Sequence, residues 1–235
     1  MYHVSRNVYL STLSSFILLI TSYGISNEPG TFFTDQLNNS DVIEGFVPLG
    51  DEILQQLDKD IDAICDTIGT AGTLMGIAKS FKNVGSNCKI VALEPASSPI
   101  LSKGIKGAHN VEGVGLGFIP AIYNSKYVDN VITIEESTAR KTCRDLAIRE
   151  GIFCGTSSGM NVAGALQLSK DLGPKSRVVA VARRQARRTD AAPTHARPPA
   201  SARTRWKTSS GRWVAGSPRH ALVRPSGVTI AVSTA

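Results

Sequence analysis

Residues 61–95 read IDAICDTIGTAGTLMGIAKSFKNVGSNCKIVALEP, and this stretch decides the fold class. The apolar runs at 61–65 and 89–93 are each typical of a short buried strand. Between them, the segment 73–81 has apolar side chains at positions 74, 77, 78 and 81, which is the spacing of one helix face. A strand, a helix and a strand in this order predict two parallel strands joined by a crossover helix.

The same alternation continues toward residue 182. The segment 128–134 is typical of a strand, and the residues from 135 onward place Ala139, Cys143, Leu146 and Ala147 on one helix face. A third helix is predicted over 158–172, where Gly173-Pro174 ends it, and a last strand over 178–181. The fold class predicted for 31–182 is therefore α/β, a parallel twisted sheet with flanking helices.

The net charge of +7 is carried by the end of the chain. Residues 183–235 contain eleven Lys and Arg against the single acid Asp190, whereas the preceding residues are net acidic. With one Leu and no Phe or Tyr, this tail lacks the apolar surface that would offset its ordering entropy, so disorder is predicted. Alternatively, it binds nucleic acid by counterion release, with Trp206 and Trp213 as stacking groups. Its abrupt change of composition is also typical of translation in another reading frame.

Residues 1–30 form an apolar leader of a different composition. No charged residue occurs between Arg6 and Glu28, so the segment 7–27 is long enough to span a membrane. Its many Ser and Thr residues dilute the apolar character, and no clear signal-peptide cleavage site follows. We therefore expect a cytoplasmic protein, and the alternative is a protein anchored in a membrane through 7–27.

The four cysteines predict free thiols in a reducing compartment. Cys65, Cys88, Cys143 and Cys154 form no Cys-x-x-Cys pair and have no zinc-like spacing to the four histidines. We therefore expect buried thiols without disulfides, and no metal site.

A loop of small residues, Gly69-Thr70-Ala71-Gly72-Thr73, joins the first strand to the first helix. Such a loop turns its backbone N–H groups inward, and the helix N-terminus adds partial positive charge. The two hydroxyl groups add further donors, so the loop predicts a phosphate site without a lysine. The alternative is a tight turn with threonine caps. The pattern is neither a Walker A loop nor the Gly-x-Gly-x-x-Gly of dinucleotide folds.

Two further stretches are rich in small residues. The segment 155–159 opens a helix, and we expect Ser157 or Ser158 to be its N-cap. The segment 113–120 has glycine at positions 113, 115 and 117, which favours close packing of the backbone against a ligand or another chain segment.

The order of these motifs resembles that of the cysteine synthase and cystathionine β-synthase family, the fold-type II pyridoxal-phosphate enzymes. The resemblance covers about residues 31–182 and implies a fold like the tryptophan synthase β-subunit, here truncated. The motifs that carry it lie at 32–39 (FFTDQLNN), 61–63 (IDA), 69–73 (GTAGT), 91–95 (VALEP), 109–120 (HNVEGVGLGFIP) and 150–159 (EGIFCGTSSG).

The resemblance implies a β-replacement reaction, in which O-acetylserine and sulfide give cysteine, with pyridoxal phosphate as cofactor. It implies that Gly69, Thr70, Ala71, Gly72 and Thr73 bind the cofactor phosphate, and that the protein takes a small amino-acid substrate and forms a homodimer. Ala71 stands where the family loop has glycine, and we expect its methyl group to require a φ below zero. Cystathionine β-synthase and serine or threonine dehydratase chemistry remain alternatives.

The family's Schiff-base lysine, in a Ser-x-Lys-Asp/Asn-Arg motif, has no counterpart here. Lys59, Lys79 and Lys82 do not resemble it, and the Thr-Ser-Gly-Asn loop for the substrate carboxylate is absent as well. We therefore assign no catalytic residue and expect an inactive fragment, without covalent attachment of the cofactor. The alternatives are a non-catalytic remnant that binds phosphate or a protein partner, and a nucleic-acid binder that acts through the tail.

Overall fold

The computed structural model describes residues 24, 29–31, 33–58 and 60–183, and the backbone of four short strands between 205 and 233. The chain divides into two compact units, Met1–Asn39 and Ser40–Ala235. In the first, the described residues include a turn in which Asn38 Nδ2 donates to Asp35 Oδ1 at 2.8 Å. None of the described helices is long and apolar enough to cross a membrane. Apart from Gly24, the leader segment 7–27 lies outside the described residues.

The second unit is built on one six-stranded sheet. Its strands are β1 (Ala63–Thr67), β2 (Lys89–Pro95), β3 (Asn130–Ile134), β4 (Val178–Arg183), β7 (His220–Val223) and β8 (Val228–Ser233). Their order across the sheet is β3-β2-β1-β4-β8-β7, and only β7 and β8 pair antiparallel. The predicted parallel sheet is confirmed for β1 to β4.

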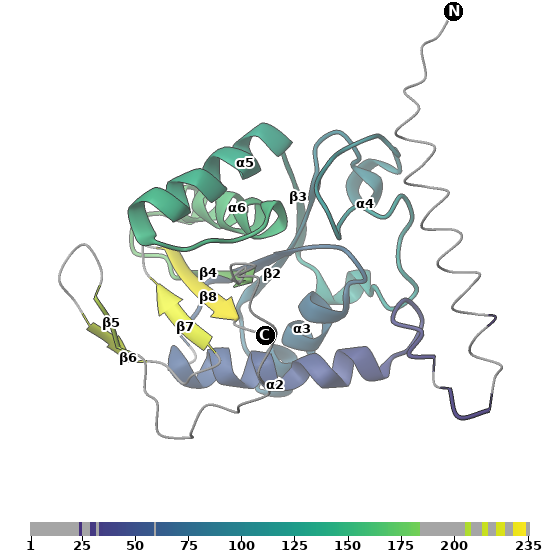
Figure 1. The fold of residues 1–235 in the computed structure, drawn as a ribbon. Helices are drawn as coiled ribbons and strands as arrows, with labels where there is room; N and C mark the ends of the chain where they lie inside the picture. The colour runs from purple at the N-terminus through teal and green to yellow at the C-terminus, as the bar shows by residue number, and fades with distance from the viewer. Residues whose placement is uncertain are drawn as a thin grey trace, which may run out of the picture. The chain divides into compact units, whose positions relative to one another are not determined.

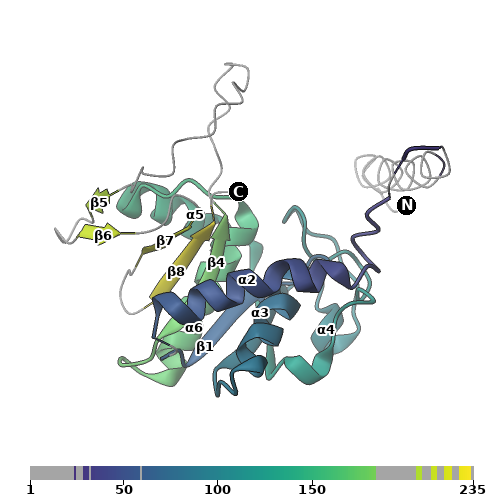
Figure 2. The same ribbon diagram turned by 90° about the horizontal axis from the view of Figure 1, so that it is seen from below.

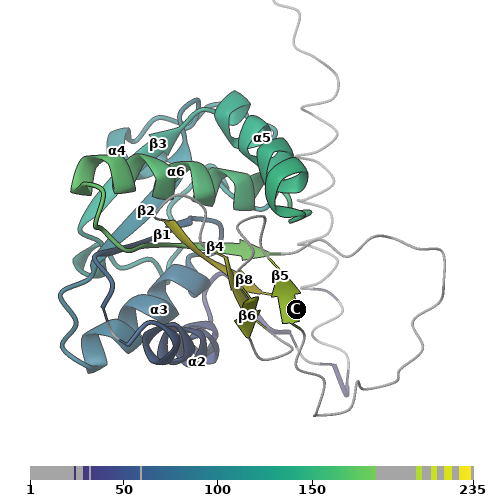
Figure 3. The ribbon, with the colours of Figure 1, turned by 90° about the vertical axis from the view of Figure 1, so that its left-hand side faces the viewer.

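Four longer helices cover the sheet. They are α2 (Asp41–Gln56), α3 (Gly72–Asn83), α5 (Glu136–Asp145) and α6 (Thr156–Leu172). Shorter helical segments are α4 (Ile100–Lys103), the 3-10 turn η1 (Ser125–Tyr127) and the π-helical turn η2 (Leu146–Glu150). Helices α2 and α3 lie on one face of the sheet, and α5 and α6 lie on the other (Figures 1 and 3). This is the layered arrangement that the sequence predicted.

The core lies on both faces of the sheet because successive strand residues point in opposite directions. One apolar cluster joins Ile64, Ile90 and Val179 to the helices α2 and α3. The other joins alternate positions of the same strands, such as Cys65 and Val91, to α5 and α6. Strands buried on both faces explain the nearly continuous apolar runs in the sequence.

Helix α2 was not predicted from the sequence, since Pro48 lies in its interior. The helix runs along α3 (Figure 2), and glycines of α3 let the two backbones approach closely. A Cβ atom at Gly76 would lie 2.6 Å from the Ile43 carbonyl oxygen and would overlap the side chain of Phe46. Packing against α3 therefore stabilises a helix that its own sequence disfavours.

The structure describes four short strands between residues 205 and 233, and disorder of the rest of 183–235 stays a prediction. The short strands β5 (Arg205–Lys207) and β6 (Trp213–Ala215) form an antiparallel pair. Strand β8 pairs in parallel with β4 and extends the main sheet. Its sequence, VTIAVS, is rich in β-branched residues that favour strands, a local signal that the average composition of the tail conceals.

Candidate functional site

The candidate site lies where the chain reverses its direction of travel across the sheet. From β1 the chain passes through α3 to β2 and then β3 on one side, and it returns later to β4 on the other side of β1. In open α/β sheets, ligands bind beyond the carboxyl ends of the strands at such a reversal. The loop 69–73 follows the carboxyl end of β1, at this point of the fold.

The loop 69–73 presents free hydrogen-bond donors. Helix α3 begins at Gly72, so the backbone N–H groups of its first turn have no acceptor within the helix. No other described backbone or side-chain group accepts from Thr70, Gly72 or Thr73. Both threonines are partly exposed, and the helix dipole adds positive potential at this end. This arrangement fits a phosphate group.

Ala71 adopts a left-handed backbone conformation, with φ 73° and ψ −9°. The expectation of a φ below zero is therefore wrong. An L-residue with a Cβ atom is strained in this region by about 1–2 kcal/mol relative to right-handed conformations. Ala71 is nevertheless buried in the core that α3 shares with the sheet. The surrounding packing thus imposes the loop conformation that the glycine of the family motif would adopt without strain.

Replacing Ala71 with glycine should stabilise the protein. We expect Ala71→Gly to raise the free energy of unfolding by about 1 kcal/mol in urea titrations, because it removes the strain at positive φ. The matched control is Ala78→Gly, in the interior of α3, which should lower the free energy of unfolding by about 1 kcal/mol or more. A loss of stability on Ala71→Gly would contradict this account of the loop.

The segment 109–117 packs directly on the loop. Gly115 N donates to the Ile68 carbonyl at 3.0 Å. A Cβ atom at Gly69 would overlap the carbonyl oxygen of Gly113, so glycine is required at 69 for this approach. The predicted close packing of the glycines at 113–117 against another chain segment is confirmed, and that segment is the candidate phosphate loop.

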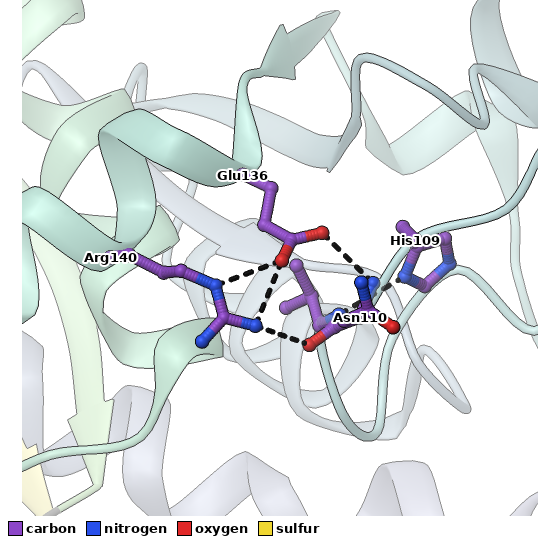
Figure 4. Close-up of polar contacts among 5 residues, drawn as sticks. His109, Asn110, Glu136 and Arg140 are labelled. Atoms are coloured by element: carbon purple, nitrogen blue, oxygen red, sulfur yellow. Dashed lines mark hydrogen bonds and ion pairs between the residues drawn. The ribbon is translucent and has the colours of Figure 1, made fainter.

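A polar network anchors the start of this segment to α5 (Figure 4). Glu136 accepts from Asn110 N at 2.9 Å and from Arg140 Nε at 2.8 Å. These hydrogen bonds, with the Arg140 charge, lower the pKa of Glu136. Arg140 also donates to the Asn110 carbonyl at 3.3 Å, and His109 Nε2 lies 3.0 Å from the Gly115 carbonyl oxygen. The network therefore holds both ends of the turn that covers the loop.

Asn161 of α6 joins β1 to β4, and no pattern in the sequence indicated this role. Its Oδ1 accepts from Thr67 N at 2.8 Å, and its Nδ2 donates to Asp66 Oδ1 at 2.5 Å and to the Val181 carbonyl at 2.7 Å. Asp66 is buried, and desolvation raises its pKa to about 7 against the opposing effect of hydrogen bonds from Asn161 and Thr67. Asn161 thus fixes the strand end from which the loop departs.

The start of α6 differs from the prediction. Its N-cap is Gly155, and neither Ser157 nor Ser158 has that role. Ser158 lies inside the first turn, buried, and its Oγ accepts from Arg183 N at 3.0 Å. The serine therefore holds the end of β4 against α6 instead of capping the helix.

Two of the three lysines that do not resemble the Schiff-base lysine have partners on other elements. Lys79 forms an ion pair with Glu44 of α2, and Lys82 lies 4.7 Å from the centroid of the Tyr127 ring. Lys59 lies outside the described residues, as do the side chains of the tail, Trp206 and Trp213 included. In the described part of the chain, no cluster of three or more His, Cys, Asp or Glu residues is able to hold a metal ion.

Comparison with known proteins identifies the family of the chain. The family model described as "Pyridoxal-phosphate dependent enzyme" matches residues 20–183. The chain belongs to this family. Members of the family use pyridoxal phosphate, and the donors of the loop 69–73 suit the phosphate group of that cofactor.

Cysteine synthases are among the proteins to which this chain is similar. The chain is 44% identical over 133 residues to a cysteine synthase of Staphylococcus aureus, covering 56% of this chain and 43% of the relative. It is 38% identical over 152 residues to cysteine synthase B of Campylobacter jejuni, covering 63% and 50%. A crystal structure of cysteine synthase from Entamoeba histolytica superimposes with a TM-score of 0.60 at 34% identity, covering 64% and 45%. The chain thus spans about half the length of these relatives.

Proposed function

We propose that this protein binds pyridoxal phosphate through the loop 69–73. We propose further that its fold is that of enzymes with cysteine synthase-type activity, which is the β-replacement of an activated serine. The observation that carries the proposal is the packing of 113–117 on the loop, with free N–H donors and two hydroxyl groups at the start of α3. The similarity to named cysteine synthases supports O-acetylserine and sulfide as the substrates.

Each part of the site has a distinct task. The N–H groups of Gly72 and Thr73, the hydroxyl groups of Thr70 and Thr73, and the dipole of α3 bind the phosphate. The segment 109–117 packs on the loop. Asn161 accepts a hydrogen bond from Thr67 N and so holds the end of β1, from which the loop departs. When bound, the cofactor supplies an electron sink for the α-carbon of an amino acid.

The 235 residues contain no Ser-x-Lys-Asp/Asn-Arg motif. We therefore propose that this chain by itself binds the cofactor noncovalently and does not convert O-acetylserine to cysteine, because covalent attachment and proton transfer each need a positioned lysine. A homodimer and an amino-acid substrate, which the resemblance implies, stay predictions.

Equilibrium dialysis of the full chain against pyridoxal phosphate tests the binding. We expect saturable binding, and no binding of pyridoxal, which lacks the phosphate. The double variant Thr70→Ala/Thr73→Ala should weaken binding about tenfold or more, because hydrogen bonds to a charged group contribute about 1.5–3 kcal/mol each. Thr142→Ala on α5 is the matched control and should bind like the parent chain. Equal binding of pyridoxal would contradict the proposal.

A cysteine assay tests the second part separately. The purified chain with pyridoxal phosphate, O-acetylserine and sulfide should form cysteine no faster than the cofactor alone. Turnover above that blank would contradict the proposed inactivity and show that a lysine of this chain reaches the cofactor, and a Lys→Ala series that begins with Lys59 and Lys79 would identify it.

A further inference from the structure

Two of the four cysteines line one hollow, and no residue of the candidate phosphate loop 69–73 contributes to its wall. Cys143 lies near the end of α5 and Cys154 shortly before α6, and both thiols are free and half-buried. Their side chains hydrogen-bond to each other. Cys65 and Cys88, in contrast, are buried in the core. The prediction of four buried thiols is therefore right for one pair and wrong for the other.

The Cys143 thiol donates to the Gly155 carbonyl oxygen at 3.2 Å, and other groups around the sulfur favour its thiolate form. A Cβ atom at Gly159 would overlap the Cys143 sulfur, so the absence of a side chain there makes room for it. The hydrogen bond from Cys154, the backbone N–H of Gly159 and the charge of Arg140 together lower the pKa of Cys143 to about 7, against desolvation. The hydrogen bond to Cys143, burial and the neighbouring charge raise the pKa of Cys154.

Both thiols line a hollow of about 320 Å³ with a basic rim. Arg140 is held in place by its ion pair with Glu136, at 2.8 Å (Figure 4). Arg144 lines the same hollow and forms no ion pair with the described residues. Arg140 is paired with Glu136, and Glu112 also contributes to the wall, so the unpaired Arg144 is the group that favours ligands that carry a carboxylate.

We propose that Cys143 and Cys154 are a redox-active dithiol that exchanges with small disulfides bearing carboxylate groups. Cys143 is the attacking thiol and Cys154 is the resolving thiol. The hollow has no lining residue in the loop 69–73, although Asn110 and Glu112 of the segment that packs on the loop contribute to its wall. The proposal does not depend on the cofactor.

The exchange takes place in two balanced steps. The Cys143 thiolate attacks one sulfur of the small disulfide, whose S–S bond breaks, and one small thiolate leaves and takes a proton from water. This step removes the negative charge that held the proton on Cys154. Cys154 then loses its proton to solvent and attacks the Cys143 sulfur, which expels the second small thiolate. The two protein thiols are oxidised to one disulfide, and the small disulfide is reduced to two thiols.

Peptide mapping of the full chain tests the proposal. Oxidised glutathione is added to the reduced protein, the mixture is quenched with acid, and free thiols are alkylated before trypsin digestion. We expect peptides 142–144 and 150–170 joined by a disulfide, while Cys65 and Cys88 are alkylated only after unfolding. Absence of the joined peptides, or modification of Cys65 or Cys88 at the same rate, would overturn the proposal.

Single variants distinguish the two roles. Cys154→Ser should accumulate a glutathione adduct on Cys143, because nothing resolves it. Cys143→Ser should react at Cys154 about tenfold or more slowly, since thiolate content governs the attack. Cys88→Ser is the matched control and should form the joined peptides like the parent chain. If Cys154→Ser and Cys143→Ser reacted at equal rates, neither thiol would be the preferred attacking group, and the mechanism would be refuted.

Discussion

We expect Asn161→Leu to lower the free energy of unfolding by about 3–5 kcal/mol. Leucine has a similar volume but offers no hydrogen bond, so the Thr67 N–H, an Asp66 oxygen and the Val181 carbonyl lose a partner. Leaving a buried polar group unsatisfied costs about 1–3 kcal/mol. Asn161 itself is 4% exposed, so water does not replace the amide.

The same substitution should weaken cofactor binding. Thr67 is two residues before the loop 69–73, and its N–H is held by Asn161. Urea unfolding measures the stability loss, and equilibrium dialysis of the folded variant against pyridoxal phosphate measures the affinity. Gln167→Leu, on the exposed side of the same helix, is the control and should change stability by less than about 0.5 kcal/mol. If Asn161→Leu proved as mild as this control, the amide would not hold the strands together.

The elements that the sequence predicted carry strong local signals. Apolar spacing alone predicts the helix at 73–81 and the strand at 128–134, and the structure extends the helix to Gly72–Asn83 and shortens the strand to Asn130–Ile134. Helix α2 was missed because Pro48 disfavours it locally, and the packing against α3 that stabilises it involves residues far apart in the chain.

The candidate site likewise has features that the sequence predicts and features that depend on residues far apart in the chain. Small residues at 69–73 mark a backbone that is able to surround an anion, and this pattern is visible in the sequence. The conformation of Ala71 was mispredicted because the local preference of alanine yields to the fixed ends of the loop. Asn161 was missed because its partners lie 94 and 95 residues away and its own helix is rich in Ala and Leu. No local pattern distinguishes such an amide from an exposed one.

The second large effect concerns Asp66, which we expect to make stability depend on pH. Burial raises its pKa in the folded protein from 3.8 to about 7. Below about pH 4 both the folded and the unfolded states hold the proton, and Asp66 has no effect. Between about pH 4 and pH 7 the unfolded state alone loses it, so the free energy of unfolding falls as pH rises. Above about pH 7 both states are ionised and the loss is constant.

Asp66→Asn removes this ionisation and keeps an oxygen that accepts from Asn161 Nδ2. Since one pKa unit corresponds to about 1.4 kcal/mol, a shift of about three units sets an upper limit of about 4 kcal/mol. Relative to the parent chain, the variant should therefore gain up to about 4 kcal/mol between about pH 4 and pH 8. Urea titrations across this range measure the gain, and taking the difference between the two chains cancels the other carboxylates.

The Asn161→Leu background provides a matched comparison for this effect. Without the Asn161 amide, Asp66 loses a hydrogen bond that lowers its pKa, so the folded-state pKa should rise further and the decline in stability should extend above pH 7. Adding Asp66→Asn to that background should then restore more stability at high pH than it adds to the parent chain. A parallel pH dependence of Asp66→Asn and the parent chain would mean that the Asp66 carboxyl group ionises equally in both states, and the buried position of its charge would then have no energetic consequence.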